Sequence, residues 1–410
     1  FINKKILLLK SYSYRTFSSL SVPAYRNLWL GLLFLMAGIS IQILARGYLT
    51  WDLSKSPVAV VLVGSGFAPP ILLFSIFGGA VADRLSLRKI IQYGQLGVTL
   101  IALFIGFSIA FEVITIYHLV VSSLLQGTIW AFLMPARQAI IPELVDDEHI
   151  TNATALNASG MSLMSFLAPG IGGLVYGYFG AAVTYYIIAG FAFLAFLMTG
   201  FVPSVRKKIP KKNFYKDIKE GFGYVAKNRT VLYLLVVALS TALLSMPYRT
   251  LLPVQIEEVF NKEVEALGLL LSVIGVGALI GTLFIAGLSK KDKRGWVLIF
   301  TSILSGFTIM ISGLNSSYLL AIILMLFLGL GDSGRRALNI SLILENTDDE
   351  YRGRVMGLYT INFGLIPLGA IPLGFIADTL GIQQAYFFAG LLLIIFALGY
   401  TIFTSKIRKL

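Results

Sequence analysis

The residue whose type and position most strongly indicate chemistry is Asp332. Nearly all of the chain's 20 acidic residues lie in polar segments or at the ends of apolar runs, whereas Asp332 lies well inside the apolar run Tyr318–Leu342. A carboxylate in the middle of a bilayer costs roughly 2.5–3.5 kcal/mol, so it is expected to face a cavity or a charged partner. Burial disfavours the ionised form, which makes Asp332 a candidate proton carrier. The alternative is a static ion pair with Arg335 or Arg336, at helical spacings of three and four.

Two further arginines lie inside apolar runs. Arg46 and Arg249 occupy nearly corresponding places in the first and the seventh run. Arginines on facing helices would attract anionic or carbonyl-rich substrates. The alternative is that both side chains extend to the membrane interface, because both lie in the outer part of their helices. The residues beside them that could stack or hydrogen-bond in such a cavity, or simply pack, are Gln42, Tyr48, Tyr248 and Trp130, and Arg335 and Arg336 would add positive charge.

The segments that carry these residues are predicted to be membrane-spanning helices. The chain is 57% hydrophobic and 13% charged, against roughly 25% charged in soluble domains. Its apolar runs each approach the ~20 residues that cross ~30 Å of hydrocarbon. We therefore predict an all-α membrane protein of about twelve transmembrane helices. The runs are Leu28–Trp51, Val58–Val81, Ile90–Phe111, Ile114–Ala136, Asn152–Tyr176, Val183–Pro203, Val231–Val254, Leu267–Leu288, Trp296–Leu314, Tyr318–Leu342, Val355–Ala377 and Ala385–Phe403.

The basic residues predict the orientation of these helices. The formal charge of +13 is concentrated in the N-terminal arm, in the segment after the sixth run and in alternate loops, rather than in one stripe that could bind nucleic acid. The other loops are poor in lysine and arginine, and residues 257–265 are acidic. We therefore expect a multi-pass protein of the cell (inner or plasma) membrane with both termini cytoplasmic. The arm before Leu28 shows no cleavable signal peptide and is expected to lie on the membrane surface or to be disordered.

Several chemistries are not expected. The chain has no cysteine, so thiolate metal sites and cysteine nucleophiles are excluded. Its two histidines, His118 and His149, are predicted on opposite membrane faces, and no phosphate-binding loop for ATP is present. We expect no metal, no cofactor and no enzymatic activity. The expected partners are a small-molecule substrate, protons and the lipid bilayer, with the protein a monomer.

The second half of the sequence repeats features of the first half. Gly79 recurs as Gly281, and Glu143 recurs as Glu345, both at an offset of 202 residues. Matches at one offset near half the chain length indicate two six-helix halves in parallel orientation. We accordingly divide the chain into a cytoplasmic arm (1–27), an N-terminal six-helix bundle (28–203), a basic cytoplasmic linker (204–230), a C-terminal six-helix bundle (231–405) and a cytoplasmic tail (406–410).

Four segments resemble motifs of a known family. The loop after the second run spells Gly-x-x-x-Asp-Arg followed by Arg-Lys. Two further segments are similar to the drug:proton antiporter-3 branch of the major facilitator superfamily, which includes macrolide efflux proteins and enterobactin exporters. They are Gln42 to Leu49 with the following Leu53 to Pro57, and Pro135 to Val145. Ala168 to Gly173 resembles a helix-bending antiporter motif, with alanine in place of its first glycine. The motif residues are Gly79, Asp83, Arg84, Arg88 and Lys89 in the loop, and Pro169, Gly170, Gly172 and Gly173 in the fifth run.

The resemblance carries expectations about mechanism. It implies two bundles around a central cavity that opens alternately to each side of the membrane. It also implies that Asp83 holds the halves together on the cytoplasmic side, against the start of the eleventh run near Arg354. One departure is clear, because Ser123 stands where the family often has an arginine linked to proton transfer.

These observations predict a secondary active transporter. The expected function is proton-coupled export, by antiport, of a small amphipathic molecule such as a drug or a siderophore-like compound. Proton-coupled uptake and lipid or lysolipid flipping are the transport alternatives. A membrane scaffold or sensor without transport is disfavoured, because an embedded carboxylate is costly and no soluble sensor domain is evident.

Overall fold

The structure is a computed structural model that describes residues 17–74, 85–204, 214–288, 293–348 and 350–403. Within these ranges the chain forms helices joined by short turns, and no β-strand. The elements are η1 (Ser18–Ser21), α2 (Pro23–Ser54), α3 (Pro57–Ser65), α5 (Leu87–Ala110), α6 (Ile116–Ile140), η2 (Ile141–Glu143), α7 (Asp147–Gly200), α8 (Phe214–Lys227), α9 (Arg229–Leu244), α10 (Met246–Thr250), α11 (Leu252–Glu258), α12 (Val264–Ala286), α13 (Arg294–Leu314), α14 (Tyr318–Glu345), α15 (Arg352–Gly364), α16 (Ile366–Leu380) and α17 (Ile382–Phe403).

Eleven helical segments of the described chain are long and apolar enough to cross a membrane. One of them, α7, has 54 residues and would be about 80 Å long if it were straight, which is far more than a bilayer needs. It bends at Gly180, whose φ of 80° and ψ of 173° glycine adopts most readily. With α7 counted as two spans, the described residues provide twelve crossings, as predicted, and both of their ends lie on one side, here named the terminal side. The opposite side is where α2 ends and α7 bends.

Two spans are broken by proline. The predicted run Val231–Val254 forms α9, α10 and α11, and Pro247 and Pro253 lie in the first turns of the last two. The predicted run Val355–Ala377 is divided into α15 and α16 just before Pro367. Proline has no N–H to continue a helix and clashes with the preceding turn, so a new helix starts at each of these positions. These breaks matter for the site, because Ser245 lies at the first of them.

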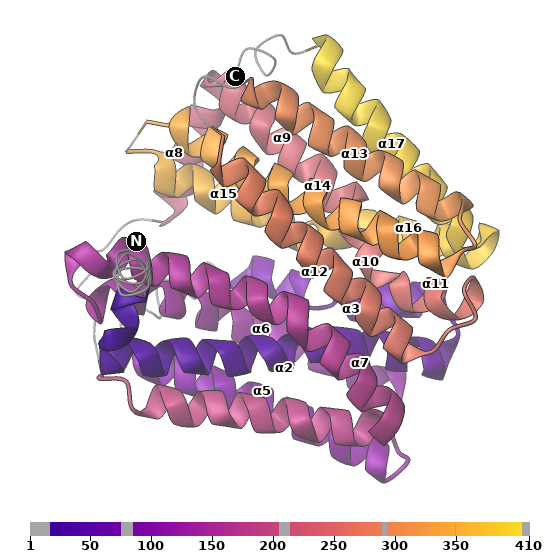
Figure 1. The fold of residues 1–410 in the computed structure, drawn as a ribbon. Coiled ribbons are helices and arrows are strands. Elements are labelled where there is room, and N and C mark those ends of the chain that lie inside the picture. The colour runs from indigo at the N-terminus through magenta and orange to yellow at the C-terminus, as the bar shows by residue number, and fades with distance from the viewer. Residues whose placement is uncertain (1–16, 75–84, 205–213, 289–292, 349, 404–410) are drawn as a thin grey trace, which may run out of the picture.

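The two halves of the chain form two groups of packed helices (Figure 1). Helices α2, α5, α6 and α7 pack together in the first half, and α9, α13, α14 and α17 in the second. Contacts between the halves run chiefly through two helix pairs, α7 with α12 and α3 with α16. The all-α fold with two six-helix halves is thus as predicted.

The hydrophobic core is arranged differently on the two sides of the membrane. On the opposite side one continuous cluster of buried residues includes Leu49 and Val60 of the first half and Leu267 and Leu373 of the second. On the terminal side each half has clusters of its own. Among the described residues, therefore, a shared apolar core joins the halves only on the opposite side.

The glycines of the antiporter-like motif lie at this junction. A Cβ atom at Gly173 would lie 3.0 Å from the Cα of Gly268 on α12, and one at Gly170 would lie 2.8 Å from Oγ of Ser272. Gly172 faces Ile41 of α2 in the same way, and Pro169 lies inside α7. The small residues therefore let the backbones of α7 and α12 approach closely, as in other membrane helix pairs.

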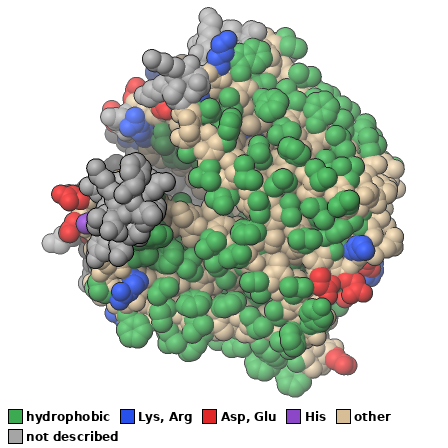
Figure 2. Space-filling model, viewed as in Figure 1, with side chains coloured by type: hydrophobic (Ala, Val, Ile, Leu, Met, Phe, Trp, Pro, Cys, Tyr) green, Lys and Arg blue, Asp and Glu red, His purple; other side chains and the backbone are tan. Residues whose placement is uncertain are grey.

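The outer surface suits a lipid environment. Large apolar side chains are exposed along most spans, for example Phe107, Leu283 and Ile402. Figure 2 shows one face covered mainly by hydrophobic side chains, with the charged ones near its edges. Such a continuous apolar surface is stable in lipid and would aggregate in water.

The linker contains a helix that the sequence did not predict. Helix α8 packs against α15, and Glu220 forms an ion pair with Arg354 at 2.9 Å. Next to it the ring of Tyr224 stacks on that of Tyr351, with 4.4 Å between ring centroids. The linker is therefore attached to the terminal end of the eleventh span.

Candidate functional site

A small pocket lies at the middle of the second half. Its volume is about 50 Å³, enough for a few water molecules. Its walls come from α9, α10, α14 and α15, and its polar residues include one carboxylate and three guanidinium groups. The lining residues are Ala238, Thr241, Ala242, Met246, Arg249, Asp332, Ser333, Arg335, Arg336, Asn339, Tyr359 and Asn362.

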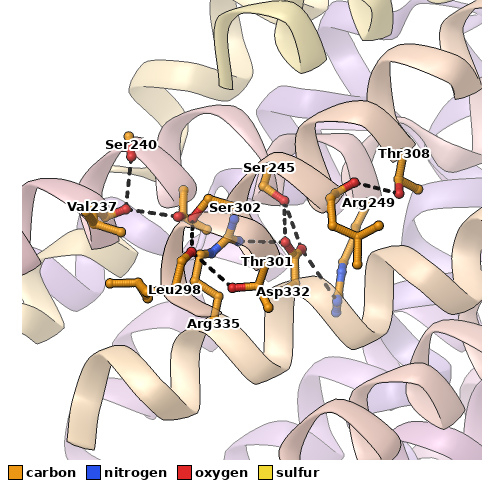
Figure 3. A network of polar contacts seen from close by, with 12 residues as sticks. Val237, Ser240, Ser245, Arg249, Leu298, Thr301, Ser302, Thr308, Asp332 and Arg335 are labelled. Carbon is orange, nitrogen blue, oxygen red and sulfur yellow. Dashed lines mark hydrogen bonds and ion pairs between the residues drawn. The ribbon is translucent and has the colours of Figure 1, made fainter. Parts of the chain in front are cut away.

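Asp332 is the centre of the polar contacts in this pocket (Figure 3). Its side chain is 10% exposed, and its Oδ1 accepts a hydrogen bond of 2.6 Å from Nη2 of Arg335. The hydroxyl of Ser245 lies 2.8 Å from both carboxylate oxygens. Arg249 approaches from α10, with its Nη2 atom 4.0 Å from Oδ2. The carboxylate is therefore neutralised by ion pairs within the protein.

Local sequence explains how these side chains meet. Arg335, Arg336 and Asn339 lie three, four and seven residues after Asp332 on α14, which puts them on the same side of the helix as Asp332. Ser245 is the residue between α9 and α10, where the span breaks before Pro247. The break turns Ser245 and Arg249 toward the middle of α14. A span that was straight from α9 to α11 would have different side-chain positions there.

The structure shows which arginine pairs with Asp332. Arg335 is the partner, and its side chain is 2% exposed. Arg336, the other candidate, lines the pocket but is exposed, and no ion pair of the described residues includes it. An ion pair does not by itself exclude proton transfer, because protonation of Asp332 would simply release Arg335 and Arg249.

Arg46 lies in a separate network in the first half. It is 5% exposed, and its Nη1 donates a 2.8 Å hydrogen bond to Oε1 of Gln126. Gln126 in turn donates from Nε2 to Oε1 of Gln42 at 2.7 Å. Arg46 is not a lining residue of the Asp332 pocket, and none of the ion pairs between described residues includes it. Its side chain points into the bundle rather than toward the membrane interface.

The aromatic candidates lie outside the pocket. The ring of Tyr48 packs against Tyr176 at 5.4 Å between centroids. Tyr248 is fully buried, and its hydroxyl lies 2.7 Å from Oγ of Ser312. Trp130 packs at the edge of a core cluster of the first half. None of the three lines the pocket around Asp332.

The loop motif is only partly described. Gly79, Asp83 and Arg84 lie outside the described residues. Arg88 and Lys89 are in the first turn of α5, where Nε of Arg88 donates to Oε1 of Gln92 at 3.2 Å.

A polar contact joins the halves on the opposite side. Glu257 of α11 accepts a 2.8 Å hydrogen bond from Nε1 of Trp51 and a 2.6 Å bond from Nζ of Lys55, both at the end of the first span. Burial acts against the Lys55 charge, but its bonds to Glu257 and Asp52 outweigh that effect and raise its pKa. The half-exposed ion pair between Lys55 and Glu257 contributes at most about 1 kcal/mol. The hydrogen bond from Trp51 is better shielded from water, because the Trp51 side chain is 2% exposed.

The fold and the site define a class of protein, and comparisons with known proteins identify it. Residues 14–409 match the model of a family described as transmembrane secretion effector. The chain is 25% identical to a staphyloferrin A transporter of Staphylococcus aureus over 83% of its length and 86% of that protein's. It is 23% identical to macrolide efflux protein A of Streptococcus pyogenes, over 94% and 97%. The crystal structure of the nucleoside transporter NupG superposes with a TM-score of 0.80 at 12% identity, covering 93% of this chain and 100% of that one.

The chain thus belongs to this family of the major facilitator superfamily. It is a membrane-embedded transporter of small molecules and not an enzyme. Sequence reasoning identified four of the pocket residues, Asp332, Arg335, Arg336 and Arg249, but missed the lining residues Asn339, Asn362 and Tyr359. It also missed Ser245, the hydrogen-bond partner of Asp332. The spacing of Asn339 from Arg335 could have indicated it, whereas Asn362 and Tyr359 come from α15 and only the packing of helices brings them here.

Proposed function

We propose that this transporter exports small amphipathic molecules from the cytoplasm by alternating access, in exchange for protons that Asp332 carries. The observation that carries the proposal is the position of this carboxylate. Asp332 lies at the middle of the 28-residue helix α14, in a pocket formed with the broken seventh span. An ionisable residue at that depth is costly, and in membrane proteins such residues commonly mark ion or substrate pathways.

The hydrogen bonds of Asp332 suggest how a proton and a substrate would exclude each other. An ionised carboxylate offers about four acceptor positions. Arg335 and the single Ser245 hydrogen use two of them, which leaves room for a hydrogen-bond donor of a substrate. A proton on Asp332 removes much of this acceptor capacity and weakens its ion pairs. Substrate donor and proton would therefore compete for one carboxylate, as antiport requires.

The asymmetry of the core supports the alternating-access part of the proposal. A shared apolar core joins the halves on the opposite side only. If the terminal side is cytoplasmic, as the basic residues predict, the halves are closed toward the exterior in this conformation. One proton that moves down 100 mV supplies about 2.3 kcal/mol, enough for a concentration gradient of roughly fiftyfold in a neutral compound.

The proposal is tested first in cells and then in proteoliposomes. Cells with and without the protein are compared for resistance to and efflux of a panel of amphipathic compounds, with and without a protonophore. A compound that is exported is then added to proteoliposomes that contain a pH-sensitive dye. We expect it to move protons in the opposite direction to itself. Export that a protonophore leaves unchanged, with no proton movement in proteoliposomes, would refute proton exchange.

A further inference from the structure

The pocket around Asp332 contains more hydrogen-bond donors than acceptors. Asp332 is the only carboxylate among the described lining residues, and three arginines line the same pocket. Nη1 of Arg335 and Nε of Arg249 are buried and have no hydrogen-bond partner among the described residues, and the same holds for Nδ2 of Asn362. Among the buried acceptors of the described lining residues, Oδ1 of Asn339 alone lacks a hydrogen-bond partner. Buried donors are normally satisfied, so a cluster without partners indicates a ligand that supplies acceptors.

We propose that this pocket binds the carboxylate group of an anionic amphiphile. The inference rests on the proposed function and specifies its substrate class. Guanidinium groups bind carboxylates through paired, charge-assisted hydrogen bonds, which are about twice as strong as neutral ones. Arg249 and Arg336 are the groups free to do so. Nη2 of Arg249 lies 4.0 Å from Oδ2 of Asp332, too far for a hydrogen bond, and Arg336 is exposed at the pocket wall.

Asp332 does not cancel the positive charge of the pocket. It is bonded to Arg335, whose buried side chain it holds in place through Nη2, and leaves Nη1 of the same group unpaired. Arg336 therefore has no ion pair among the described residues, and Arg249 has only the 4.0 Å contact with Asp332, without a hydrogen bond. A second carboxylate would be attracted to them, while a dication would meet unpaired like charges at low dielectric, which is unfavourable by several kcal/mol.

The size of the pocket limits what enters it. A volume of about 50 Å³ holds a carboxylate group but not a whole amphiphile. The apolar part of the ligand would extend out of the pocket past Met246 and Ala238, which are apolar lining residues. The polar residues of the pocket would thus bind the carboxylate, and its apolar walls would contact the apolar part of the ligand.

The experiment uses three fluorescent probes that share one apolar body. Dansyl-glycine carries a carboxylate, dansyl-glycinamide is its neutral amide, and dansyl-cadaverine is a cation. Binding is titrated by fluorescence with the purified, full-length protein in detergent, without any gradient. The variants are Arg249→Gln and Arg336→Gln. The control Arg229→Gln removes the same charge from the terminal end of the same span, where the residue is exposed and outside the pocket.

We expect the protein to bind dansyl-glycine about tenfold more tightly than the amide, since a hydrogen bond to a charged group contributes about 1.5–3 kcal/mol. Each pocket variant should remove most of this preference without weakening amide binding, and Arg229→Gln should keep it. Thermal unfolding verifies that each variant is folded. Equal affinity for the three probes, or tighter binding of the cation, would overturn the inference. The binding assay uses no gradient, so it tests the carboxylate site separately from proton exchange. Proton-driven export without a carboxylate preference would refute this inference and leave the proposed function intact. A carboxylate preference without proton-driven export would support this inference and refute proton exchange.

Discussion

The substitution Asp332→Asn separates a proton carrier from a static ion pair. Asparagine keeps an acceptor for Nη2 of Arg335 but removes the negative charge that Arg335, 2% exposed, and Arg249 now face. Breaking a buried ion pair by removing one partner typically costs 3–5 kcal/mol. Here a neutral hydrogen bond to Arg335 can persist, at about half the strength of the charged one. We therefore expect the free energy of unfolding to fall by about 2–3 kcal/mol.

Stability and transport are then measured on a second variant, Asp332→Asn/Arg335→Gln, in which both charges are absent. Thermal unfolding in detergent should show that most of the lost stability returns, because the deeply buried charge of Arg335 is gone and the remaining Arg249 is 39% exposed. Proton-driven transport in proteoliposomes should be absent both in Asp332→Asn and in the double variant, because neither has a carboxylate at this position. Asp378→Asn, which neutralises an exposed carboxylate on α16, is the matched control and should leave both measurements unchanged.

Two results would refute this reasoning. If the double variant regains proton-driven transport together with stability, Asp332 is a structural partner of Arg335 and the proton passes elsewhere. If the single variant is as stable as the parent protein, the ion pair between Asp332 and Arg335 contributes nothing to the free energy of unfolding.

Three further predictions concern topology and the junction between the halves. Tags fused to Phe1 and Leu410 should be accessible only from the cytoplasm, and a label in the loop 257–265 only from outside; an external N-terminus would reverse the orientation. Glu257→Gln should weaken the contact with Trp51 and Lys55 and populate a state open on the opposite side. Spin labels on two cysteines introduced into this cysteine-free chain, one in each half, would report the open state as longer distances between the labels. An unchanged distribution of these distances would show that the Glu257 contact does not hold the halves together. Gly173→Leu should clash with the α12 backbone and abolish transport, whereas normal transport would show that close approach there is dispensable.

The sequence by itself determined the helices and the most informative residue. Twelve crossings follow from apolar runs, because a bilayer requires about 20 apolar residues per helix and leaves no backbone group unsatisfied. Asp332 was evident from its residue type, since a carboxylate inside such a run is costly. Its partner Arg335 was one of two possibilities at helical spacing. These features depend on local sequence and on the membrane alone.

Tertiary structure decided which distant residues meet. Arg46 and Arg249 occupy matching places in the repeat, yet Arg249 lies beside Asp332 while Arg46 is hydrogen-bonded to Gln126 in the other half. The difference depends on the break before Pro247 and on which faces of the helices pack together. The same is true of helix α8 and of the side on which the halves share a core. Spacing along one helix is fixed by its period of 3.6 residues, but the approach of separate helices depends on packing between segments far apart in the chain.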